Sequence, residues 1–266
     1  MEIIQFDISG KFAHFRKYYA NNTALTYSLP PRTTVMGMLA AILGRSRDSY
    51  CEEFSSEKIK IGIAIKSPIK KNFHRLNFLS IKSLGDFRKS FESDFRGMAG
   101  NSIQTPFEVI TGLDLQKDDI CYRIFIGRTE NGQETFQALK ESLLNGIQVY
   151  AITLGTANFN ASINNVISYE NSQITENQSI NEFLRFDSAV NSDSVSEINF
   201  DKDGTIMSFI EEELLPADFV SNNNRELSKM NRVLYTTSGV PLNVKLSGIS
   251  YNISNKSIVQ TIQFLD

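Results

Sequence analysis

Hydrophobic and polar positions alternate most strictly between residues 59 and 66. Isoleucines stand at 59, 61, 63 and 65, separated by lysine, glycine or alanine. This period of two predicts a strand that places one isoleucine face against a core. Shorter apolar segments predict further strands at 2–8, 105–110, 120–126 and 149–154. A polar turn between 114 and 119 is expected to join the strand at 105–110 to the strand at 120–126.

Two segments have the longer spacing of an amphipathic helix. The first begins at Pro30-Pro31, where proline suits an opening turn, and ends at Gly44. In the second, capped by Thr129 or Asn131, Phe136, Leu139 and Leu143 recur on one face before Gly146. The order is therefore β-α-β, a long insertion, then β-α-β. This split pattern predicts an α+β, ferredoxin-like fold, with two helices on one sheet face and the other face open to bind single-stranded RNA.

Beyond residue 156 the chain is richer in Asn, Ser and acidic residues. Residues 201–204, Asp-Lys-Asp-Gly, predict a hairpin turn, and Glu211-Glu212-Glu213 is interpreted as a solvated acidic patch. We expect two units: 1–155, with an insertion around 66–110, and a smaller, mostly β module at 156–266.

Charge divides the chain unevenly, although its net value is only −3. Residues 1–130 hold 19 Lys and Arg against 14 Asp and Glu, whereas residues 131–266 hold 8 against 16. The strongest basic excess lies in 65–96. Such a segment is either a solvated loop or a surface for a polyanion. Hydrophobic and charged fractions of 41% and 21% are ordinary for a globular domain and exclude disordered and fibrous classes.

Cysteine and histidine are scarce. Cys51 and Cys121 are expected to be separate thiols in a reducing compartment, and two histidines give too few ligands for a zinc site. We expect no metal and no cofactor. The acidic, strand-like start at Met1–Phe6 and the lack of a long apolar run predict a cytoplasmic protein without a membrane partner.

Two stretches carry candidate chemistry. In Gly10–Tyr19, cations interleave with aromatic rings and a histidine, which offers charge for phosphates and flat faces for bases. The alternative is that Phe12 and Phe15 belong to the core. At the start of the first helix, free backbone N–H groups beside Arg32 and two threonines suit a phosphate, unless the threonines simply cap the helix.

The run from Phe6 to Leu43 resembles the opening of CRISPR-associated protein family 5. It contains Phe-Asp-Ile-Ser-Gly, then Ala-His-Phe-Arg, then Tyr-Ser-Leu-Pro-Pro-Arg-Thr-Thr-Val-Met-Gly. Residues 150–161 and the Leu-Pro-Ala-Asp at 215–218 are also similar, and the length and proline motif are most like type I-B members. The resemblance covers the first 160 or so residues well and the rest loosely.

The resemblance implies a non-catalytic subunit of Cascade, the crRNA-guided surveillance complex of antiviral defence. A ferredoxin-like palm would grip the crRNA 5′ handle, and a β-hairpin thumb at 66–110 would reach toward the backbone subunit. The large subunit would dock nearby, and target DNA would be met only through the complex. Carried onto matching positions, the resemblance implies that Arg16, Arg32, Thr33 and Thr34 contact RNA from the palm. Charge and location alone add the thumb-region candidates Lys70, Lys71, Arg75, Arg88 and Arg96. The aromatic and basic stretch adds His14, Lys17 and Tyr18.

Two other functions remain open from the sequence. Type I-C members of the family are metal-independent endoribonucleases, and His14, His74, Tyr18 and Lys70 are the groups that would supply acid, base and charge here. Nothing in the sequence places these groups in catalytic order. The other possibility is an interaction module without an RNA role, built around the acidic second half.

Overall fold

The alternating isoleucines form a strand of a central four-stranded sheet. This is seen in a computed structural model, which describes residues 1–20, 23–79, 83–92, 102–200, 209–222, 224–255 and 258–266. The sheet is antiparallel throughout, in the order β4-β7-β1-β8. Its members are β1 (Ile3–Gly10), β4 (Ile59–Ile65), β7 (Ile120–Arg128) and β8 (Ser162–Tyr169). The chain is thus of mixed α+β class, as expected.

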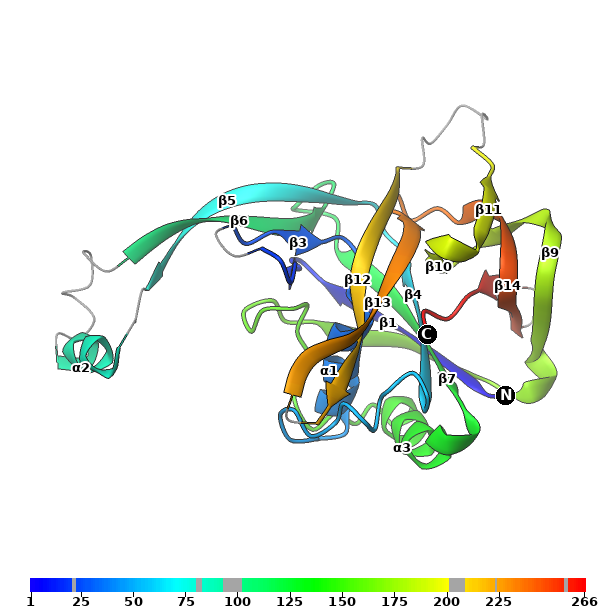
Figure 1. Cartoon of the computed structure of the whole chain (residues 1–266), viewed down its shortest axis with the longest axis horizontal. Helices are drawn as coiled ribbons and strands as arrows, with labels where there is room; N and C mark the ends of the chain where they lie inside the picture. The colour runs from blue at the N-terminus through cyan, green and yellow to red at the C-terminus, as the bar shows by residue number, and fades with distance from the viewer. Residues whose placement is uncertain (21–22, 80–82, 93–101, 201–208, 223, 256–257) are drawn as a thin grey trace.

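Both predicted helices pack on one face of this sheet (Figure 1). Helix α1 (Arg32–Ile42) follows Pro31, and Gly44 beyond its end has a φ of +69°. Helix α3 (Gln133–Leu144) buries Phe136, Leu139 and Leu143, the face predicted from their spacing, in the same core cluster as the isoleucines of β4. The predicted side-chain cap is wrong. Thr129 donates its hydroxyl to the Glu57 carbonyl instead, and a short 3-10 helix, η2 (Glu130–Gly132), precedes α3.

The second face of the sheet is not left open, contrary to the sequence prediction. Strands β14 (Leu242–Asn255) and β15 (Ile258–Ile262) return over it. Their Tyr251, Ile253 and Ile262, together with Phe264, bury Ile3 and Phe125. Because aliphatic and aromatic side chains cover this part of the sheet, RNA cannot lie across it.

The predicted closing strand at 149–154 is also wrong. Val149 and Tyr150 donate their backbone N–H groups to the carbonyls of Ile42 and Ala41, so this segment caps the end of α1. Because these N–H groups bond to α1, they are not available to pair with a neighbouring strand. The side chains of both residues are exposed. The fourth strand of the sheet is β8, which lies beyond the expected boundary at 155.

The insertion forms a long two-stranded arm that projects from the body (Figure 1). It consists of β5 (Ile69–Leu79), helix α2 (Leu84–Glu92) and β6 (Ser102–Gly112). Strands β5 and β6 pair from Ile69–Gly112 to Leu79–Ser102. The predicted strands at 105–110 and 120–126 both exist, but they do not pair with each other. We call residues 69–112 the arm.

The remaining elements are short or lie in the C-terminal half. They are β2 (Phe15–Arg16), β3 (Thr26–Tyr27), η3 (Asn171–Gln173), β9 (Ile174–Phe186), β10 (Val190–Asn191), η4 (Ser192–Ser194), β11 (Val195–Ile198), β12 (Ile210–Ser221) and β13 (Asn224–Thr236). Strands β12 and β13 form a hairpin that contacts α1. The turn predicted at 201–204 lies outside the described residues. No helix in the described part of the chain is long and apolar enough to cross a membrane.

Candidate functional site

The structure brings the aromatic and basic loop at 10–28 against the base of the arm. Ala13 exchanges two backbone hydrogen bonds with Ile110, of 3.1 and 2.9 Å. Ala24 donates to Pro106 and accepts from Glu108, both at 2.9 Å. Two segments that the sequence analysis singled out separately therefore form one surface.

His14 is a packed residue of this junction. It is 4% exposed, and its ring stacks on Phe107 with centroids 4.1 Å apart. Its Nδ1 lies 2.7 Å from the Glu108 carbonyl oxygen, which can only accept, so Nδ1 carries the proton. Burial lowers the His14 pKa, although the bond to Glu108 opposes this. The ring is enclosed rather than offered to RNA. His74 lies opposite Phe107 across the arm and is exposed.

Beside His14, the loop presents a cation and two aromatic rings to solvent. Arg16 is exposed and donates to the Ala20 carbonyl at 3.0 Å. Tyr18 and Tyr19 are each 55% exposed, with ring centroids 5.2 Å apart and nearly perpendicular planes. Phe15 is buried, in line with the alternative that assigned it to the core. Arg16 and Tyr18 lie where RNA could reach them.

Lys17 and Lys71 are engaged by an acidic pair. The Lys17 ammonium lies 2.6 Å from Glu213, and the Lys71 ammonium lies 3.5 Å from Glu211 and 3.7 Å from Glu213. Burial lowers the Lys17 pKa, but Glu213 and Tyr19 together raise it by more, so the net shift is upward. The Tyr235 hydroxyl lies within 3.1 Å of both carboxylates.

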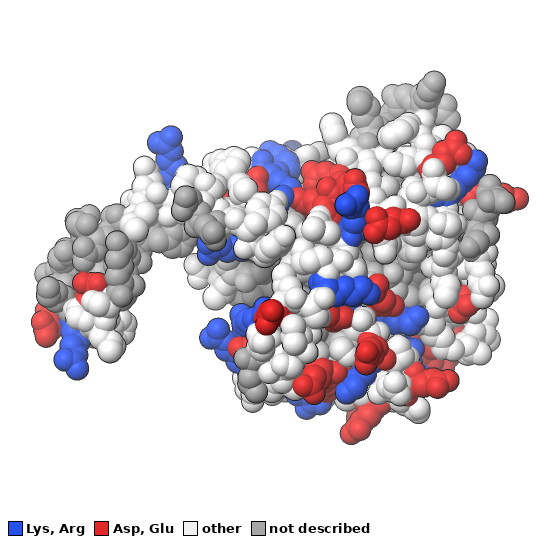
Figure 2. All heavy atoms as spheres, in the orientation of Figure 1, with Lys and Arg blue, Asp and Glu red and all other residues white. Residues whose placement is uncertain are grey.

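The predicted solvated patch at 211–213 is therefore wrong for Glu213, whose side chain is 11% exposed, whereas Glu211 is 37% exposed and meets both Lys71 and solvent. Only Glu212 faces away, toward Ser192 and Arg232. Period-two alternation along a strand was the signal available in the sequence, because it places Glu211 and Glu213 on one face and Glu212 on the other. Figure 2 shows acidic and basic side chains adjoining where the arm meets the body.

Further cations lie along the arm. Lys70 is exposed at its base and donates to the Leu113 carbonyl at 2.7 Å. Arg75 is exposed on β5, and Arg88 is exposed on α2 near the end of the arm. Arg96, also predicted to bind RNA, lies outside the described residues.

Arg32 is not a surface residue, and its predicted role as an RNA contact is wrong. It is 2% exposed and forms an ion pair with Asp218, in the Leu-Pro-Ala-Asp segment of β12. Its guanidinium also donates to the Phe54 and Ile59 carbonyls, at 2.9 and 2.7 Å. Thr33 and Thr34 are half-buried, and neither makes a capping side-chain bond at the start of α1. Arg32 therefore joins α1 to β4 and β12 instead of binding phosphate.

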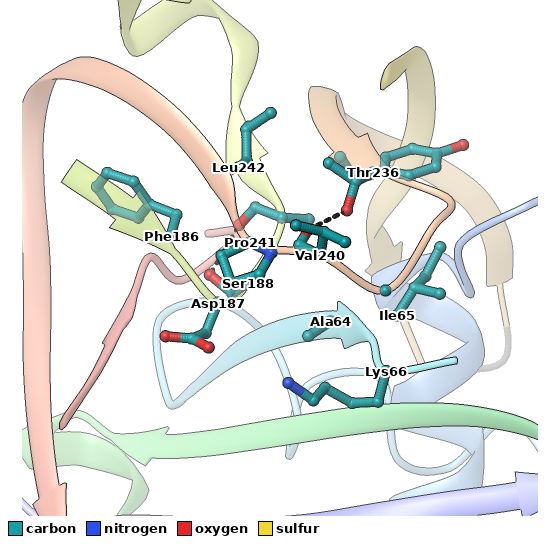
Figure 3. A pocket seen from close by; sticks show the side chains of 13 residues that line it. Ala64, Ile65, Lys66, Phe186, Asp187, Ser188, Thr236, Val240, Pro241 and Leu242 are labelled. Carbon is teal, nitrogen blue, oxygen red and sulfur yellow. Dashed lines mark hydrogen bonds between the residues drawn. The ribbon is translucent and has the colours of Figure 1, made fainter. Parts of the chain in front are cut away.

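The pocket shown in Figure 3 does not qualify as a ligand site. It lies between the end of β4 and the 186–189 and 236–242 segments, with Lys66 and Asp187 on one side. Its volume of about 10 Å³ is at the lower limit for a single water molecule. Cys51 and Cys121 are free thiols. Within the residues that the structure describes, no group of three or more His, Cys, Asp or Glu is arranged to hold a metal ion.

Comparison with known proteins identifies relatives of this arrangement. A family model described as CRISPR-associated protein (Cas_Cas5) matches residues 3–185. A crystal structure of a CRISPR protein from Archaeoglobus fulgidus is similar over 98% of both chains, with a TM-score of 0.57 and 14% identity. A chain of a CRISPR RNA-guided surveillance complex is similar over 91% of both chains, with a TM-score of 0.50 and 11% identity. No curated protein sequence matches the chain directly.

Proposed function

The chain belongs to the CRISPR-associated Cas5 family, and from this premise we propose that it is a non-catalytic, crRNA-binding subunit of a type I Cascade complex. The sheet order β4-β7-β1-β8, with one helix after β1 and one after β7, supports a ferredoxin-like palm. The arm is the proposed thumb. The subtype expected from the sequence, I-B, is part of this proposal.

One observation carries the proposal most directly. A projecting arm with exposed Arg75 and Arg88 is rooted against a loop that exposes Arg16, Tyr18 and Tyr19. Exposed cations bind phosphates without regard to sequence, and exposed rings stack on unpaired bases. This combination suits a single-stranded RNA segment, such as the crRNA 5′ handle, held where the arm meets the body. The outer part of the arm would contact the backbone subunit, and the large subunit would dock nearby.

Binding across a salt series tests the proposal. The purified protein, alone and with its backbone subunit, is mixed with RNA carrying an intact or scrambled 5′ handle. We expect tighter binding of the intact handle and a steep loss of affinity with salt, because each phosphate contact releases counterions. Arg16→Gln should lower the salt slope by roughly one unit. Equal binding of the two RNAs, both by the protein alone and with its backbone subunit, would refute the handle assignment. An Arg16→Gln variant with unchanged RNA binding would favour an interaction module without an RNA role.

A denaturing gel of the same samples tests the nuclease alternative. His14 is enclosed by Phe107 and Glu108, which is unsuited to a general base acting on RNA from solvent. We expect intact RNA in EDTA. Cleavage that disappears in His14→Ala or His74→Ala would place the nuclease first.

A further inference from the structure

We propose that Glu211 and Glu213 set the selectivity of the RNA surface, because they hold Lys17 and Lys71 until an RNA displaces them. This inference rests on the function proposed above and adds a specificity-determining pair to it. A weakly bound polyanion would find these two lysines already neutralised. An RNA with further contacts, to the arm and to the exposed tyrosines, would supply the free energy needed to release them.

The pairing geometry differs between the two lysines. Lys17 makes a direct contact of 2.6 Å to Glu213, with side chains 15% and 11% exposed. The Lys71 ammonium stays 3.5 Å or more from both carboxylates, longer than an N–H···O hydrogen bond. Lys71 is thus held by charge alone and would be released first, and Lys17 second.

The carboxylates are held independently of the lysines. Ser28 donates its hydroxyl to Glu211 at 2.6 Å, and the Tyr235 hydroxyl lies 2.7 Å from Glu213. Ser28 and Tyr235 are 1% and 2% exposed and belong to the body. Each carboxylate therefore keeps a hydrogen-bond donor when a lysine leaves, which reduces the penalty of an unpaired charge.

The lysines, in contrast, have long flexible stems that can turn toward solvent. Lys17 stands next to the exposed Arg16 and Tyr18, and Lys71 shares one face of β5 with the exposed Phe73 and Arg75. A ligand bound over these residues would bring phosphates within reach of both ammonium groups. The fixed carboxylates compete with the ligand's phosphates for the two ammonium groups. A ligand that binds weakly elsewhere cannot displace them and is therefore rejected.

A matched pair of variants tests the idea. Glu213→Gln removes one charge from the lysine-facing side of β12, and Glu212→Gln removes one from the opposite side of the same strand. Binding is measured by fluorescence anisotropy with intact-handle and scrambled RNA across a salt series. We expect Glu213→Gln, and more so the Glu211→Gln/Glu213→Gln double variant, to bind scrambled RNA about tenfold tighter with a salt slope steeper by roughly one to two units. Selectivity for the intact handle should fall, and Glu212→Gln should behave as wild type.

A second background distinguishes freed lysines from general repulsion. When Lys17→Met and Lys71→Met are added to the double glutamine variant, the gain should disappear. A gain that persists without the lysines would overturn the inference, as would a double glutamine variant with wild-type affinity and selectivity. Melting temperatures confirm that each variant is folded, and the single glutamine variants replace the double one if it is unstable. Failure of the proposed function itself would show in the wild-type protein, as absence of salt-dependent RNA binding.

Discussion

At the scale of single residues, the Arg32–Asp218 pair is a buried electrostatic link between the two halves of the sequence. Asp218 also accepts from the Ser56 backbone at 3.2 Å, so the pair fixes α1, the 54–59 segment and β12 together. Both residues stand in stretches that the sequence analysis found similar to the family. The sequence could not show that they pair, because 186 positions separate them.

Asp218→Asn should destabilise the protein by about 3–5 kcal/mol, because it removes the directly paired counterion of the buried Arg32 and leaves only the charge of Asp266 to act on it. The free energy of unfolding in urea measures this. Asp48→Asn serves as the control, since Asp48 pairs with the 55%-exposed Arg225 side chain and such pairs contribute about 0–1 kcal/mol. Equal effects of the two substitutions would contradict the assignment. Arg32→Met with Asp218→Leu should recover part of the loss.

His14 should make stability depend on pH. Its pKa in the folded protein is lowered by burial, from about 6.5 in the unfolded chain. The neutral ring is therefore favoured on folding. The stability that His14 contributes is fully present above pH 6.5 and is lost as the pH falls from 6.5 toward the lowered pKa of the folded protein. Between pH 7.5 and pH 5.5, the melting temperature should fall further in the wild type than in His14→Phe, which keeps a ring against Phe107. Parallel losses in both proteins would count against this role.

At the scale of elements, the arm combines a packed base with an exposed outer part. Phe107, Val109 and Ile110 of β6 are buried, whereas Phe73, Leu76 and Ile103 are exposed. The apolar segment at 105–110 predicted the inner part of β6. No local pattern predicted β5, where polar and basic residues interrupt the apolar positions. Pairing with β6 imposes the strand on β5, and pairing between distant segments is not visible in local sequence.

Replacing residues 75–106 with Asn-Gly should leave the body folded and weaken RNA binding. His74 and Phe107, the residues that flank the replacement, face each other across the arm, so a two-residue turn can close the shortened hairpin. The deletion removes the five cations of this segment, Arg75, Lys82, Arg88, Lys89 and Arg96, and the salt slope should fall by roughly two units or more. Melting temperature and near-UV circular dichroism test the fold, and anisotropy tests binding. Unchanged RNA affinity in a folded variant would exclude the arm from the interface.

At the scale of the whole molecule, the two halves of the chain form ion pairs with each other and pack against each other. The acidic second half supplies Glu211 and Glu213 to lysines of the basic first half, so the linear charge asymmetry overstates how basic the surface is. The same return of the chain covers the sheet face expected to be open. Local patterns predicted both helices and most of the central strands, but they could not show what the last 25 residues cover.

Phe264→Ala should destabilise the protein by about 3–5 kcal/mol, because Phe264 is 7% exposed and packs edge-on against Tyr251 at 5.3 Å. Ile258→Ala, in the same terminal segment but 63% exposed, should change stability by less than about 0.5 kcal/mol. Urea unfolding compares the two. Similar small effects would mean that the C-terminal cover does not stabilise the sheet.

The arm leaves the central sheet after β4 and returns to it at β7, and these two strands are immediate neighbours. The excursion therefore begins and ends at almost the same place and interrupts none of the sheet's hydrogen bonds. Its reach is free to lengthen or shorten over evolutionary time while the sheet keeps its register. The same geometry makes the outer end of the arm a suitable place to insert a fluorescent reporter domain. Only the paired strands β5 and β6 would connect that domain to the body, so the body would keep its fold.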